Sequence, residues 1–137
     1  MKWYLKVLLE NYANFSGRAR RQEYWMFVLF QIIIIVLLSF LCDALYDFLN
    51  VDLFAILFGV FFIGTLIPWL AVNVRRLHDT GKSGSYIFIN LIPLIGRIWY
   101  IILVATNGDF GPNQYGPDPK VYYSDEEIDE IGKTQVD

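Results

Sequence analysis

The sequence predicts an all-α membrane protein, with an N-terminal amphipathic helix at the membrane interface and three membrane-inserted helical segments. Hydrophobic residues make up 55% of its 137 residues, and the mean hydropathy is +0.40, which is high for a soluble domain of this size. The apolar residues gather in long runs. Aromatic residues stand at the ends of these runs, where amphipathic rings settle at the headgroup level of a bilayer.

Residues 2–14 have the pattern of an amphipathic helix. A polar stripe repeats every four residues and consists of Lys2, Lys6, Glu10 and Asn14. Apolar and aromatic side chains cover the remaining surface, so we expect the helix to lie in the membrane interface with its lysines at the headgroups. Packing of the same helix against the membrane spans is compatible with this location.

Two membrane spans are predicted, over about 24–49 and 53–72. The first contains an apolar run of 18 residues that is broken only by Gln31 and Ser39, which is long enough to cross the hydrocarbon core. The second has 20 residues and no charge. Pro68 removes one backbone hydrogen bond, so we expect a kink near the end of this span.

The third apolar segment covers about 85–106 and is less uniform. Asn90 and Arg97 interrupt it, and residues 93–96 weaken a helix. We expect one full crossing, in which Arg97 reaches the outer surface or pairs with an aspartate at the outer end of the first span. The alternative is a re-entrant hairpin with its tip at residues 93–96, shielded by the other helices.

The C-terminal part is polar. Turn-forming residues follow the third segment, and an acidic tail occupies residues 121–137. Ser124 and Glu127 fit a capping box for a short helix over 125–131, and a disordered tail is the alternative. We therefore expect one polytopic membrane domain over residues 1–120, followed by the tail.

The distribution of basic residues predicts the orientation. Five basic residues precede the first span, three follow the second, and none lies in the turn between the two spans. They are Lys2, Lys6, Arg18, Arg20 and Arg21 in the first group and Arg75, Arg76 and Lys82 in the second. Because cytoplasmic loops carry an excess of Lys and Arg, the N-terminus and the loop of residues 73–84 are expected in the cytoplasm.

Several segments together resemble a known family. They include GRARRQEYW over residues 17–25 and VRRLHDTGKSG over residues 74–84, with further matches at 3–6, 91–96 and 111–119. The chain resembles the bacterial inner-membrane family catalogued as domain of unknown function 805, over roughly residues 1–120. The resemblance implies a small polytopic protein of the inner (cytoplasmic) membrane, and it implies no reaction.

The central polar segment offers two further interpretations. Its Gly-Lys-Ser sequence is not a phosphate-binding loop, because Arg76 stands where the first glycine is required and no strand precedes it. His78 and Asp79 beside two arginines could form an acid–base and anion-binding set. However, no motif places a serine or cysteine nucleophile, and we favour a structural or lipid-facing loop in which Asp79 caps the next helix or pairs with Arg76.

We therefore expect a non-enzymatic membrane protein that binds lipid or other membrane proteins, without catalytic residues or cofactors. The expected contacts to anionic lipid or to a partner are Arg18, Arg20, Arg21, Arg75, Arg76 and Lys82. A single cysteine, Cys42, and a single histidine exclude an internal disulfide and make a metal site improbable. A basic surface with interleaved aromatics for nucleic acid is absent from the sequence.

Two other classes of function stay open. A subunit of an oligomeric transporter or channel would use the intramembrane polar residues Asn90 and Arg97, and the chain could form a homo-oligomer in that case. An enzyme that modifies lipid headgroups would use His78 and Asp79.

Overall fold

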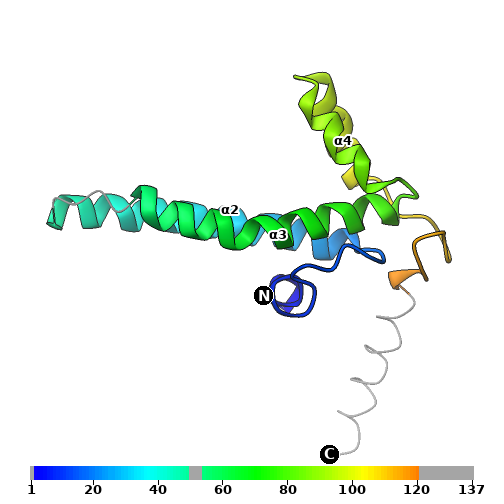
Figure 1. The fold of residues 1–137 in the computed structure, drawn as a ribbon, viewed down its shortest axis with the longest axis horizontal. Helices are drawn as coiled ribbons and strands as arrows, with labels where there is room; N and C mark the ends of the chain where they lie inside the picture. The colour runs from blue at the N-terminus through cyan, green and yellow to red at the C-terminus, as the bar shows by residue number, and fades with distance from the viewer. Residues whose placement is uncertain (1, 50–53, 121–137) are drawn as a thin grey trace, which may run out of the picture. The chain divides into compact units, whose positions relative to one another are not determined.

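We analysed the chain in a computed structural model, which describes residues 2–49 and 54–120 (Figure 1). The described residues form helices and turns, with one isolated β-bridge between Asn113 and Gly116 and no strand. The all-α prediction is confirmed for this part of the chain. The predicted turn at residues 50–52 and the acidic tail of residues 121–137 lie outside the described residues.

The chain divides into two compact units, which we describe separately. The first consists of Met1–Asn14 and Gln22–Val72, and the second of Phe15–Arg21 and Asn73–Asp137. The first contains most of two long apolar helices. The second contains the central polar segment and everything that follows it.

The N-terminal segment of the first unit is shorter than predicted. It comprises α1 (Lys2–Leu5) and a π-helical turn, η1 (Lys6–Glu10), which is closed by a 3.0 Å hydrogen bond from Asn11 N to Lys6 O. Tyr4 is buried, and its hydroxyl donates to Gln31 Oε1 at 3.1 Å. Packing of this segment on the first long helix is thus confirmed, whereas its location in the membrane interface stays a prediction.

Two long helices, α2 (Arg21–Leu49) and α3 (Phe54–Asp79), account for the predicted spans. Within them, Arg21–Asp47 and Ile56–Asp79 are long and apolar enough to cross a membrane. Two of their hydroxyl side chains bond to the backbone of their own helix: Ser39 Oγ donates to Ile35 O, and Thr65 Oγ1 donates to Phe61 O. Such internal pairing suits an environment without water.

Helix α3 continues seven residues beyond the predicted end of the second span. The segment 73–84 is therefore a loop only in its last part, and the prediction of a loop from residue 73 is wrong. The physical reason is that Arg75, Arg76 and Asp79 are buried at this end of the helix, where the polar side chains have internal partners.

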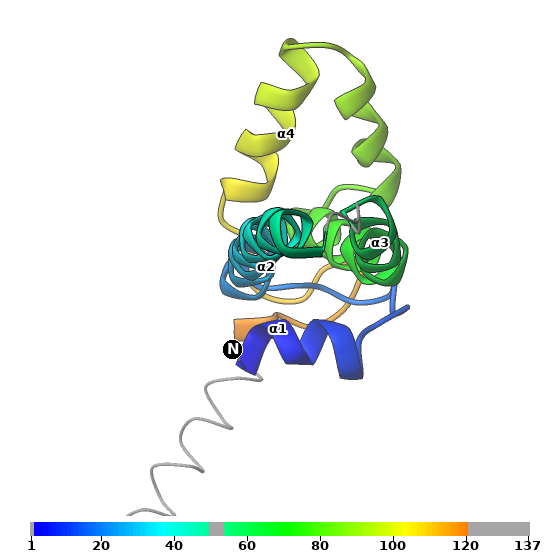
Figure 2. The ribbon, with the colours of Figure 1, turned by 90° about the vertical axis from the view of Figure 1, so that its left-hand side faces the viewer.

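The third apolar segment is broken in two. A 3₁₀ helix, η2 (Gly84–Leu91), is followed by α4 (Ile95–Ala105), and Figure 2 shows the two side by side and joined at one end. Leu94 lies between them with φ 63°, a conformation that a leucine rarely adopts. A Cβ at Gly96 would overlap Ile89 O, so only glycine permits this approach of the two helices. The third segment, predicted over about 85–106, is thus two helices, and the break lies at residues 92–94, at the predicted weak point of residues 93–96. Whether the segment crosses the membrane stays a prediction.

Candidate functional site

The guanidinium group of Arg76 ties together three segments of the second unit. Arg76 is fully buried, with 0% of its surface exposed. Its Nε donates to Val104 O at 2.9 Å, and its Nη2 donates to Thr106 O, both at the C-terminal end of α4. Its Nη1 donates to Ala19 O at 3.3 Å and to Asp79 Oδ2. One side chain therefore holds the end of α3, the end of α4 and the segment before α2.

Arg18 makes a second set of contacts around the same carboxylate. Its Nε donates to Asp79 Oδ1 at 2.9 Å, and both side chains are buried. Its Nη1 donates to Gly111 O at 2.6 Å, and its Nη2 donates to Asp109 O at 2.5 Å. Asp79 is thus the shared counterion of two buried arginines. Because each of the other guanidinium nitrogens of Arg18 and Arg76 donates to a backbone carbonyl oxygen, the cluster meets the condition under which buried charge is tolerated.

The loop of residues 107–118 is fixed by backbone as well as side-chain contacts. Asp109 N donates to Asp79 O at 2.7 Å, and Gly111 N donates to Asp118 Oδ2 at 3.1 Å. Burial raises the pKa of Asp118. The backbone N–H groups of Lys120 and Gly111 and the charges of Arg18 and Lys120 outweigh that effect, so the pKa of Asp118 is lowered overall.

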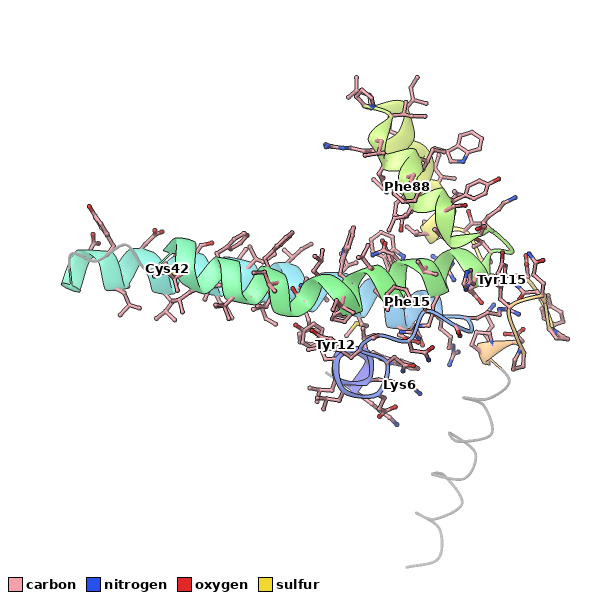
Figure 3. All side chains as sticks on the ribbon, viewed as in Figure 1. Lys6, Tyr12, Phe15, Cys42, Phe88 and Tyr115 are labelled. Carbon is pink, nitrogen blue, oxygen red and sulfur yellow. The ribbon has the colours of Figure 1, made fainter. Side chains whose placement is uncertain are left out.

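His78 lies beside this cluster and stacks on Tyr115. The two ring centroids are 3.9 Å apart, and the ring planes differ by 2°. Figure 3 labels Tyr115 in the loop that follows α4. His78 Nδ1 lies 3.2 Å from Gly17 O, and since a carbonyl oxygen only accepts, this contact requires the tautomer or ion with a proton on Nδ1. Asn113 Nδ2 donates to His78 O at 2.9 Å, which fixes the loop to the same turn of α3.

The structure brings Arg18, Arg76 and Asp79 together and places His78 next to them. The predicted pairing of Asp79 with Arg76 is confirmed. The alternative role of Asp79, as cap of the next helix, belongs instead to Ser83, whose side chain accepts from Ser85 N. Because the donors of Arg18 and Arg76 are directed at protein acceptors, these two residues support the fold, and their contact with lipid stays a prediction.

The other predicted site residues have different surroundings. Arg75 is buried, and Arg20 is half-buried. Arg21 is exposed, and its Nη1 donates to Asn107 Oδ1 at 2.8 Å. Lys82 is exposed and places its Nζ 5.9 Å from the centre of the Tyr86 ring.

The two polar residues of the third segment lie away from the cluster, in the helical hairpin formed by η2 and α4. Asn90 Nδ2 donates to Ile87 O at 3.1 Å, within η2 itself. Arg97 is exposed on α4. Their use by a transported solute stays a prediction.

Sequence reasoning missed the residues of the 107–118 loop that complete the cluster. The sequence places Asn113, Tyr115 and Asp118 in a turn-rich segment and in a stretch that resembles the family, but it gives them no role, although polar and aromatic side chains in such a segment are a signal of specific contacts. Gly108 was missed as well. A Cβ on Gly108 would overlap the Asp79 carboxylate, so the cluster needs glycine at this position.

The arrangement pairs its charged groups with one another and with the backbone. Both oxygens of Asp79 accept hydrogen bonds from arginines, so the carboxylate is not positioned as a base for His78. Within residues 2–49 and 54–120, no three His, Cys, Asp or Glu side chains gather into a group that could hold a metal ion.

The profile of a family described as protein of unknown function (DUF805) matches residues 12–117. The chain belongs to this family. It is 45% identical over 121 residues to the inner membrane protein YhaH of Escherichia coli K12, covering 88% of this chain and 98% of the relative. It is 41% identical over 120 residues to the inner membrane protein YhaI of the same strain, covering 88% and 97%.

No solved structure matches the chain at a significant level. The family, these two relatives and the apolar helices together identify a small inner-membrane protein of an uncharacterised family.

Proposed function

We propose that this protein acts by binding rather than by catalysis, and that the loop of residues 109–112 is its contact surface for anionic lipid. The observation that carries the proposal is Phe110. Its side chain is 98% exposed, more than any other large hydrophobic side chain in the described residues. Aromatic and other apolar side chains of a surface segment insert at the headgroup boundary of a bilayer, where an exposed Phe110 would find a contact.

The position of Phe110 is held by the polar cluster. Arg18 binds the carbonyl oxygens on either side of it, those of Asp109 and Gly111. The N–H groups of the same two residues bind Asp79 and Asp118. With its flanking backbone groups paired, the loop can enter the polar–apolar boundary of a bilayer without leaving them unsatisfied. In this proposal Arg18 serves lipid binding indirectly, because it holds the loop that presents Phe110. Arg76 contributes through the Asp79 carboxylate that the two arginines share.

The loop is also placed at the right height for a membrane surface. Asp109 is bonded to the last residue of α3, and Asn107 is bonded to the first residue of α2. These helices have 29 and 26 residues, or about 40 Å at 1.5 Å per residue, which matches the ~40–45 Å thickness of a bilayer with its headgroups. If both helices cross the membrane, the ends that bind the loop lie at the headgroup level, where aromatic residues are favoured.

The charges of this surface favour anionic lipid. Exposed basic residues of the second unit outside the hairpin include Arg21, Lys82 and Lys120. Each basic residue near an anionic leaflet contributes about 1 kcal/mol to binding. The same residues support a multi-pass topology with the N-terminus and residues 80–84 in the cytoplasm, since this leaflet is the anionic one.

Photocrosslinking in native membranes tests the proposal. A benzophenone amino acid replaces Phe110, and the matched control places it at Gln114, which is exposed in the same loop. We expect phospholipid adducts at position 110 in at least several-fold excess over position 114. Equal lipid adducts at the two positions contradict the proposal, and protein adducts at position 110 without lipid replace it with a membrane-protein partner.

A further inference from the structure

Both ends of the η2–α4 hairpin are fixed to the same end of α3. At the beginning of η2, Gly84 lies against Val74, so closely that a Cβ would meet Val74 Cγ1 at 2.8 Å. At the end of α4, Val104 O accepts from Arg76 at 2.9 Å. The chain therefore leaves the last two turns of α3 and comes back to them.

The turn between the two helices is built to reverse the chain. Leu94 has φ 63°, and Gly96 allows the start of α4 to touch the carbonyl of Ile89. The backbone of the turn is paired to a large extent. Ile92 N donates to Ile89 O at 3.0 Å, Ile95 N to Pro93 O at 2.8 Å and Gly96 N to Ile92 O at 3.1 Å. A broken segment with paired backbone groups is compatible with hydrocarbon, where each unpaired group costs several kcal/mol.

The outer surface of the hairpin is mostly apolar. Ten of its large hydrophobic residues are exposed: Tyr86, Phe88, Leu91, Ile92, Leu94, Ile95, Ile98, Trp99, Ile101 and Ile102. Leu91 and Leu94, next to the tip, are 79% and 78% exposed. In water, an exposed apolar surface of this kind would favour aggregation. The chain is an inner-membrane protein, so its surroundings include acyl chains.

We propose that the hairpin enters a single leaflet of the bilayer and returns to the face from which it came, with acyl chains as the partner of its outer surface. The two arms have matching lengths. The eight residues of η2 span about 16 Å at 2.0 Å per residue, and the eleven of α4 span about 16 Å at 1.5 Å per residue. Each is about half of the ~30 Å hydrocarbon core, so neither arm can cross it.

The residues after the hairpin therefore stay on the side of residues 80–83. This follows independently from the hydrogen bonds that hold Asp109 and Asn113 to the last turn of α3. Arg97 limits the depth of insertion. It is exposed in the first turn of α4, and a charge at the bilayer centre costs about 2.5–3.5 kcal/mol, so the hairpin lies at a tilt that brings its guanidinium to the headgroups of the same leaflet.

Cysteine labelling tests the return of the chain. In a Cys42→Ser background, single cysteines replace Ser83 before the hairpin and Gln114 after it, both of which are exposed. A membrane-impermeant maleimide is applied to spheroplasts and to inverted vesicles, and detergent-solubilised samples give full reactivity. We expect Ser83→Cys and Gln114→Cys to react in the same one of the two preparations and to be protected in the other. Reaction of the two in opposite preparations overturns the proposal and shows a full crossing.

A nitroxide label tests contact with acyl chains. It is attached to Leu91→Cys and, in a second variant, to Leu94→Cys, with Ser83→Cys as the water-exposed control. We expect faster collision with oxygen than with a water-soluble nickel chelate at the two tip positions, and the reverse at position 83. Nickel access at the tip equal to that at position 83 overturns insertion, and protection from both reagents overturns lipid contact in favour of a protein neighbour. In Arg97→Leu we expect a higher ratio of oxygen to nickel collisions at position 91, because the hairpin inserts more deeply.

Discussion

Arg18 and Asp79 are joined by a hydrogen bond of 2.9 Å from Nε to Oδ1, although 61 residues separate them in the chain. With Arg76 on the other oxygen, the carboxylate compensates two buried cations at once. This relationship explains why the most polar motif of the sequence lies in the interior, and it makes Asp79 the residue on which the second unit depends most.

Replacement of Asp79 by alanine should destabilise the protein strongly. The change leaves two buried guanidinium groups without their counterion, and breaking a buried ion pair in this way costs about 3–5 kcal/mol. This exceeds the ~1 kcal/mol that loss of a helix cap would cost. Thermal unfolding in detergent, followed by size-exclusion chromatography, measures the effect. His78→Ala is the comparison, for which we expect assembly in the membrane to stay intact, and equal loss in both variants contradicts this role of Asp79.

Arg76→Lys should also destabilise the fold, although it conserves the charge. A lysine ammonium cannot reach the four acceptors that the planar guanidinium binds, and the lost hydrogen bonds correspond to about 2–4 kcal/mol. Arg21→Lys is the matched control, because Arg21 is exposed and bonds to Asn107 alone among the contacts described here. Its expected change is below about 0.5 kcal/mol. If Arg76→Lys is as stable as the unaltered protein, the guanidinium hydrogen bonds of Arg76 do not contribute to stability.

Gly108→Ala tests the close packing on Asp79. The added Cβ would overlap the Asp79 carboxylate, and forcing extra atoms into such a site costs about 1–3 kcal/mol. Gly59→Ala in α3 is the control, since a Cβ there meets nothing within 4 Å. We expect Gly59→Ala to be neutral or slightly stabilising, because alanine favours a helix by about 1 kcal/mol over glycine. Similar melting temperatures for the two variants would show that the overlap of a Cβ at position 108 with Asp79 does not destabilise the fold.

The pH dependence of stability should include a contribution from Asp118. Its pKa is lowered in the folded chain, so the carboxylate stabilises the fold at pH values above its ordinary pKa of about 3.9. That contribution is lost as the pH falls through the lowered folded value. We expect Asp118→Asn to melt below the unaltered protein at neutral pH and the two to converge below about pH 4. Glu10→Gln, at an exposed position, is the control and should show a constant small difference.

The sequence was sufficient for the two long helices but not for their ends. Helix α2 begins at Arg21 and α3 continues to Asp79, because charged residues that end a hydropathy window can still be helical when their side chains have internal partners. The break in the third segment had a visible signal, since Pro93 and Gly96 weaken a helix. What hydropathy could not provide was the reversal of the chain at this break, which depends on the close contact of Gly96 with Ile89.

The candidate site was predicted in its members and not in its geometry. Sequence reasoning identifies Arg18, Arg76, His78 and Asp79, but it assigns the two arginines to the membrane surface. Contacts such as Arg18 with Gly111, 93 residues apart, result from tertiary folding and have no local pattern. The carbonyl oxygens that surround a guanidinium group are set by the tertiary structure and cannot be read from the sequence. A sequence therefore does not distinguish a buried arginine from one that binds lipid.

The orientation of the protein can be tested without disturbing the buried cluster. Neutral replacement of Arg18 or Arg76 would change the fold as well as the charge, whereas Arg21 and Lys82 are exposed. In a Cys42→Ser background with a cysteine at Asn50, we expect an impermeant maleimide to label intact spheroplasts. The double variant Arg21→Gln and Lys82→Gln should lower the labelled fraction, because Lys and Arg beside the spans set the orientation. Glu10→Gln should leave it unchanged, since acidic residues contribute little to orientation. If position 50 of the otherwise unaltered protein reacts only in inverted vesicles, the proposed orientation is reversed.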